Sequence, residues 1–113
     1  MTVMGNERPE KLTVWNNLGQ LHCQANMGHE ADDLLTSCFK ERQKKYGRDH
    51  VDTLTTMDWL AWSYTILNAS DEMVLNLLLE CYRKRMVLLG DDHVDTLRSM
   101  KQFELPLFSN WLV

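Results

Sequence analysis

The chain has 113 residues, of which 44% are hydrophobic and 25% are charged. This length suits one domain with a real hydrophobic core, and the composition is that of an ordinary globular protein. The net charge of −4 argues against a nucleic-acid-binding surface, because such a surface usually carries a concentrated basic face.

The cysteines and the apolar runs indicate the compartment. There are three cysteines and no C-x-x-C pair, so the sequence predicts neither a disulfide framework nor a zinc cluster. Reduced cysteines fit the cytosol best. The first ten residues, MTVMGNERPE, lack the apolar core of a signal peptide, and no apolar run reaches the roughly 18 residues that span a bilayer. We therefore expect a cytoplasmic protein with no membrane contact and no cofactor.

An N-terminal extension, residues 1–8, precedes a first pair of predicted helices over residues 9–25 and 30–46. Apolar or small residues step by three or four along both runs, which is the spacing of a helix with one buried face. They are Leu12, Trp15, Leu18, Gly19 and His22, then Ala31, Leu34, Leu35, Cys38 and Phe39. Between the runs, "NMGH" (residues 26–29) favours a turn. Residues 9–49 therefore predict two antiparallel helices, with His22 and Cys38 in the core.

The same pattern recurs over residues 50–92. The second copy follows the first at an offset of 42 and then of 43 residues, with the inserted residue near "LNASDE". Its helices are predicted over 51–67 and 72–89, on Leu54, Met57, Leu60, Ala61 and Tyr64, then Val74, Leu75, Leu78, Cys81 and Tyr82. One helix pair cannot bury both of its faces, so we expect the copies to stack.

A third copy, residues 93–113, begins in step and then loses the pattern. A helix is predicted over 94–105, but Pro106 removes a backbone donor where the helix should continue. The closing stretch "FELPLFSNWLV" holds seven strongly apolar residues among eleven. We expect this tail to cap the last copy, to dock on another copy of the chain or a partner, or to belong to a longer array.

The joint between copies, "GRDHVDTL" (47–54) and "GDDHVDTL" (90–97), matches at seven of eight positions. One interpretation is a metal site, with His50 beside Asp49 and Asp52, and His93 beside Asp91, Asp92 and Asp95. The other is a structural joint. The glycines, Gly47 and Gly90, would close one helix, and Asp49 or His50, like Asp92 or His93, would cap the next. We favour the joint, because segments one copy apart should not converge on one ion.

Trp15, Leu18-Gly19, His22, Ala31, Leu35 and Cys38 lie at the signature positions of the tetratricopeptide repeat. With the longer period and the joint "LG-D-H-x-D-T-L", residues 8–103 resemble the kinesin light chain type of this repeat. The resemblance implies an all-α, right-handed α-solenoid of antiparallel helix pairs, here two full repeats and a degenerate third with about five helices. It also implies a non-catalytic protein-interaction module that binds a peptide in its concave groove.

In such a stack the first helix of each pair lines the groove. The side chains predicted to face it are Asn16, Gln20, Asp58, Trp62, Thr65, Arg98 and Lys101, with Thr13, Cys23, Thr55 and Ile66 beside them. This mixture suits a peptide held by Trp62 as apolar anchor, with a carboxylate at Arg98 or Lys101. The alternative is that Trp59, Trp62 and Ile66 pack against neighbouring layers.

Two other functions remain open on the sequence alone. The chain could be an architectural fragment of a longer repeat array that self-associates through its terminal layers or its apolar C-terminal tail. It could also be a metal-dependent enzyme that uses the His-Asp joints, although no Ser/His/Asp or Cys/His set and no Gly-rich phosphate loop supports catalysis.

Overall fold

The computed structural model describes residues 11–101, and within this range the chain is helical with no strand. The helices are α1 (Lys11–Gln24), α2 (Gly28–Tyr46), α3 (Val51–Ile66) and α4 (Asp71–Leu89). A fifth helical run covers 94–101, the last residues described. The all-α prediction is confirmed. Helix α2 begins two residues before the predicted start, since the Met27 carbonyl already accepts the first helical hydrogen bond from Ala31. Pro106, the apolar tail and the N-terminal extension lie outside the described residues.

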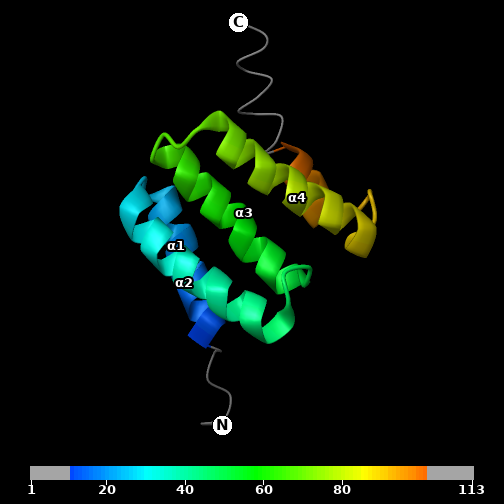
Figure 1. Cartoon of the computed structure of the whole chain (residues 1–113), viewed down its shortest axis with the longest axis horizontal. Helices are drawn as coiled ribbons and strands as arrows, with labels where there is room; N and C mark the ends of the chain where they lie inside the picture. The colour runs from blue at the N-terminus through cyan, green and yellow to red at the C-terminus, as the bar shows by residue number, and fades with distance from the viewer. Residues whose placement is uncertain (1–10, 102–113) are drawn as a thin grey trace, which may run out of the picture.

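The helices pack in chain order (Figure 1). Helix α3 lies between the α1–α2 pair and α4; it contacts α2 and α4, and also α1. Ala31, Leu35 and Leu60 are part of the core cluster between the first two pairs. Gly19 makes the close approach in the first pair possible, because a Cβ there would lie 2.5 Å from Cδ2 of Leu35. A small residue is therefore required at this crossing.

Each helix pair turns through an asparagine in the left-handed conformation. Asn26 and Asn68 both have φ of 61°. After α1, the amide of Asn26 donates to Cys23 and that of Met27 to His22; the same two bonds recur after α3. This pair of reverse hydrogen bonds is the Schellman motif, which satisfies the last carbonyls of a helix. Each pair therefore turns at an asparagine, where glycine is more common. The turn predicted over residues 26–29 is shorter than expected, because α2 already begins at Gly28.

The joint between copies is a helix stop followed by a histidine cap. Gly47 and Gly90 have φ of 93° and 91° with ψ of 161°, a region that essentially only glycine adopts. Nδ1 of His50 then accepts the amide of Asp52 at 3.1 Å, and Nδ1 of His93 accepts that of Asp95 at 3.0 Å. The cap interpretation is confirmed, and of the two candidates at each joint the histidine supplies the cap.

The second helix of each pair, α2 or α4, makes the same polar contact with the first helix of its pair. The thiol of Cys38 donates to the carbonyl of Leu12 at 3.2 Å, and that of Cys81 to Leu54 at 3.3 Å. Both cysteines are fully buried, which confirms them as small core residues. His22, in contrast, is only half-buried and its Nδ1 bonds the Leu18 carbonyl of its own helix, so its assignment to the core was wrong.

One face of α1 is less covered than the matching face of α3. Val14, Leu18 and Leu21 are 46%, 40% and 59% exposed. Their counterparts 42 residues later, Thr56, Leu60 and Ser63, are 0%, 4% and 0% exposed. The counterparts are buried because α2 packs on α3.

In residues 11–101, none of the helices has the length and apolar character needed to cross a membrane.

Candidate peptide-binding groove

A pocket lies where the last turns of α1 and α3 meet. It encloses about 410 Å³ and is lined by Cys23, Gln24, Asn26, Trp59, Trp62 and Ile66. Gln24 and Asn26 line the pocket because the turn after α1, where Asn26 has a positive φ, reverses the chain beside the end of α3. The lining combines two indole rings and an aliphatic side chain with two amides, so it suits a large apolar side chain whose backbone can be hydrogen-bonded.

The two tryptophans of α3 differ in burial. Trp59 is half-buried and packs on the cluster of Cys23, Ala31 and Leu35, and its carbonyl accepts the Cys23 thiol at 3.6 Å. Trp62 is 40% exposed. Trp59 therefore belongs to the interlayer packing that the sequence left open for both residues, whereas Trp62 keeps apolar surface at the pocket.

The thiol that lines this pocket is not a nucleophile. Cys23 is 3% exposed, and burial raises its pKa to about 11. At neutral pH the group is a neutral thiol, and the thiolate is the reactive form. Cys23 therefore contributes shape rather than chemistry to the pocket.

Asn16 and Asp58 are not free groove residues. They are 5% and 2% exposed. Oδ1 of Asn16 accepts the hydroxyl of Thr56 at 2.9 Å, and Oδ2 of Asp58 lies 3.0 Å from Nη1 of Arg85. The sequence placed both side chains in an open groove wall, and that placement was wrong, because their polar atoms bind neighbouring helices instead.

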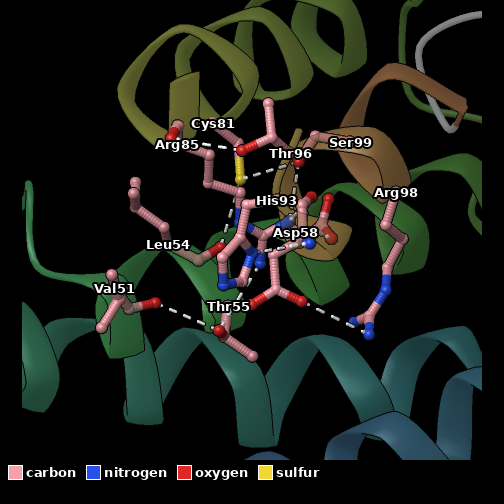
Figure 2. Close-up of polar contacts among 11 residues, drawn as sticks. Val51, Leu54, Thr55, Asp58, Cys81, Arg85, His93, Thr96, Arg98 and Ser99 are labelled. Atoms are coloured by element: carbon pink, nitrogen blue, oxygen red, sulfur yellow. Dashed lines mark hydrogen bonds and ion pairs between the residues drawn. The ribbon is translucent and has the colours of Figure 1, made fainter. Parts of the chain in front are cut away.

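Figure 2 shows the network around Asp58. Arg85 reaches from α4 to α3 and the 94–101 helix, and it is 1% exposed. Its Nη1 also donates to the hydroxyl of Ser99 at 2.7 Å and to the carbonyl of Asp95 at 3.3 Å, and its Nη2 lies 3.5 Å from the hydroxyl of Thr55. One buried guanidinium thus joins three helices.

Arg42, which is 43 residues before Arg85, makes the equivalent contacts one layer earlier. Its Nη1 donates to the hydroxyl of Thr56 and to the carbonyl of Asp52, both at 2.9 Å. Arg42 is 5% exposed. The sequence signal for both arginines was their recurrence on the apolar stripe, four residues after Cys38 and Cys81, but we assigned them no role.

Desolvation dominates the ionisation of Asp58. Burial raises the pKa of this carboxyl, and the charge and hydrogen bond of Arg85 oppose that effect. The charge of Arg98 also lowers it, so Arg98 is close enough to act on the buried carboxylate. Arg98 itself is exposed, with Nη2 3.5 Å from Oδ1 of Asp95.

The remaining predicted residues lie along the first helices without forming one cluster. Lys101 is exposed at the end of the described chain, and Gln20 is half-buried on α1. Thr65 is exposed and donates its hydroxyl to the Ala61 carbonyl at 3.0 Å. Of the predicted residues, Trp62 lines the pocket, and Arg98 lies close enough to Asp58 for its charge to act on that carboxylate. The structure adds Trp59, Gln24 and Asn26, which the sequence did not single out as groove residues.

Within residues 11–101, no group of three or more histidine, cysteine, aspartate or glutamate side chains is arranged to hold a metal ion. No protein-family model matches this chain, and no curated protein matches it. The candidate site is therefore argued from its own geometry.

Proposed function

We propose that this chain is a non-catalytic protein-interaction module that binds a peptide segment of a partner. In this proposal the helix pairs form a right-handed superhelix of the tetratricopeptide kind, similar to kinesin light chain repeats, in the cytoplasm. The first helices, α1, α3 and 94–101, line the side on which the peptide lies.

The observation that carries the proposal is the exposed indole of Trp62 at the rim of the pocket. Trp59, three residues earlier, packs into the core, so α3 has no need of a second tryptophan for its own packing. An aromatic side chain that is 40% exposed beside a pocket of about 410 Å³ is typical of a binding anchor. The amides of Gln24 and Asn26 would orient the peptide backbone, and Arg98 and Lys101 would attract an acidic group further along.

The test is selection of random 12-residue peptides displayed on phage against the intact chain, followed by affinity measurement on the enriched peptides. We expect peptides with a large apolar residue, and at least roughly 30-fold weaker binding to Trp62→Ala, because a buried aromatic anchor contributes about 2 kcal/mol or more. Val87→Ala is the matched control, since Val87 is an apolar residue of α4 that is 84% exposed. Peptides that bind wild type and Trp62→Ala equally would refute this groove.

A second candidate function is self-association through the terminal layers. The apolar face of α1, Val14, Leu18 and Leu21, favours it, because the equivalent face of α3 is buried under a helix. Light scattering of the full chain and of a chain lacking residues 104–113 would test it. We expect Leu18→Glu to reduce any dimer, whereas Met73→Glu on α4, a position 48% exposed, should not. A monomer over the whole concentration range would exclude this function.

A further inference from the structure

A second pocket lies between the helices of the first pair, on residues that the proposed groove does not use. It encloses about 560 Å³ between the start of α1 and the second half of α2. Its lining combines basic, aromatic and hydroxyl side chains: Lys11, Leu12, Trp15, Ser37, Lys40, Glu41 and Lys45. Three lysines and one glutamate therefore line one pocket of a chain whose net charge is −4. This local excess of positive charge favours an anionic ligand.

Aromatic rings hold two of the three ammonium groups. Nζ of Lys11 lies 4.5 Å from the centroid of the Trp15 ring, which is half-buried. Nζ of Lys45 lies 5.1 Å from the ring centroid of Tyr46, and that ring stacks on His50. A cation that packs on an aromatic face has lost side-chain freedom before a ligand arrives, so less entropy is lost on binding. The indole of Trp15 also gives the pocket an aromatic wall beside its charges.

The equivalent register of the second pair carries a carboxylate of the chain itself. Ser37 corresponds to Glu80, which is 43 residues later. Oε1 of Glu80 accepts Nη2 of Arg48 at 2.8 Å, and its Oε2 accepts Nζ of Lys84 at 2.7 Å. An anion at this register is therefore bound by two cations in the second pair. In the first pair the same register has the exposed hydroxyl of Ser37, so position 37 leaves the anion to be supplied by a ligand.

We propose that this pocket binds a phosphomonoester carried on an aromatic ring, either the side chain of phosphotyrosine in a peptide or a small aryl phosphate. Such a group has a charge of roughly −1.5 to −2 at neutral pH and three acceptor oxygens, which suits three ammonium groups. The ring would pack against the indole of Trp15.

The cations of the pocket favour phosphate over carboxylate. Within the described residues, no arginine lines it. An arginine fork matches a carboxylate with two parallel bonds, as Nε and Nη2 of Arg48 do for Glu80, whereas lysine binds phosphate as a point charge. In this site Lys11, Lys40 and Lys45 neutralise the phosphate, and the hydroxyl of Ser37 donates to it.

The first experiment titrates the isotopically labelled full chain with phenyl phosphate and follows the amide chemical shifts. We expect saturable shifts at residues 11–15 and 37–45, with a Kd of roughly 1 mM at low salt, as suits a ligand of this size. Inorganic phosphate lacks the ring and benzoate lacks the second charge, so each should bind at least ~5-fold more weakly. Added NaCl at about 200 mM should weaken the binding further, because exposed charges are screened.

Four variants test whether these side chains form the site. Lys40→Gln should weaken phenyl phosphate binding about 5-fold, whereas Lys44→Gln, at an exposed position of α2 outside the pocket lining, should leave it unchanged. Ser37→Glu places in the pocket the carboxylate that the second pair has at this register, and should weaken binding at least ~10-fold. Glu41→Gln removes the negative charge of the lining and should strengthen binding about 3-fold, a gain that partial unfolding cannot produce.

The proposal is overturned if phenyl phosphate shifts no amide of the pocket, if Lys40→Gln and Lys44→Gln bind it equally, or if benzoate binds as tightly. A phosphotyrosine peptide and its unphosphorylated form distinguish the two sources of the ligand. Binding of the phosphopeptide at least ~10-fold tighter than phenyl phosphate would assign the ligand to a protein, and equal or weaker binding would assign it to a small aryl phosphate. The pocket shares no lining residue with the Trp62 pocket, so these results are independent of the peptide selection.

Discussion

Glu80 ties the joint between α2 and α3 to the middle of α4, and neutralising it should destabilise the protein in a pH-dependent way. Its Oε1 accepts Nη2 of Arg48 at 2.8 Å, and Nε of the same guanidinium binds Oε2. Nζ of Lys84 lies 2.7 Å from Glu80 and 2.6 Å from Asp49. The change Glu80→Gln keeps the shape of the side chain and removes the charge that organises this network.

The size of the effect follows from the pKa of Glu80. The hydrogen bond from Arg48 and, to a lesser extent, the one from Lys84 lower it from 4.5 to about 2, against an opposing contribution from desolvation. A depressed carboxyl pKa contributes stability that is complete above the unfolded pKa and is lost as pH falls through the folded one. The full shift corresponds to roughly 3 kcal/mol. Because the side chains of Arg48 and Glu80 are 43% and 25% exposed, solvent screening reduces our expectation to about 1 kcal/mol.

Urea unfolding followed by circular dichroism would measure this contribution. Glu80→Gln should lose about 1 kcal/mol of unfolding free energy at pH 7 and much less near pH 2, where the wild-type carboxyl is itself becoming protonated. Glu41→Gln, on the exposed side of α2, is the matched control and should change little at either pH. A loss for Glu80→Gln that is the same at both pH values, or absent at pH 7, would refute the reasoning.

Three further predictions concern the joint and the buried thiols. His50→Ala should lower the unfolding free energy by about 1 kcal/mol because α3 loses its cap, and His50→Asn should recover most of it. Gly47→Ala should cost about 1–3 kcal/mol, whereas D-alanine introduced there by chemical synthesis should cost far less, since φ is positive and no atom lies within 4 Å of the added Cβ. The thiols of Cys23 and Cys81, whose pKa values burial raises to about 11 and about 12, should react slowly with iodoacetamide at pH 8 in the native state and rapidly in urea.

Each of these has a clear contrary result. Equal stability of His50→Ala and wild type would mean that the imidazole is not the cap. Equal costs for the two alanine enantiomers would show that the positive φ does not set the requirement for glycine. Alkylation of the cysteines at the same rate with and without urea would contradict their burial.

The helices, turns and joints were predictable because each depends on a local sequence pattern that occurs twice in the chain. Apolar spacing placed the helices, Asn26 and Asn68 recur in the turns, and the glycine-histidine joint recurs with only one difference. Repetition removed the ambiguity that one copy would have left, including the choice between a metal site and a cap.

The polar side chains of the groove were harder to predict. Asn16 and Asp58 lie on the face that points away from the paired helix, and their polarity suggested exposure. Their burial depends on partners from other helices, such as Arg85, which follows Asp58 by 27 residues. Helical spacing describes the residues of one helix, so it carries no information on a counter-ion that arrives from the next helix or the next layer.

The hydrogen bond from each buried arginine to a hydroxyl on the first helix of the next pair limits how this repeat array can be lengthened. Thr56 and Ser99 accept Nη1 of the preceding arginine, at 2.9 and 2.7 Å, and the residue at the same register of α1 is Val14. A duplicated helix pair fused ahead of α1 would press its arginine against an alkyl group and bury donors without an acceptor, at a cost of roughly 1–3 kcal/mol. Val14→Thr would supply the missing hydroxyl. The layers are therefore not interchangeable modules, because each first helix must carry the acceptor for the guanidinium of the layer before it.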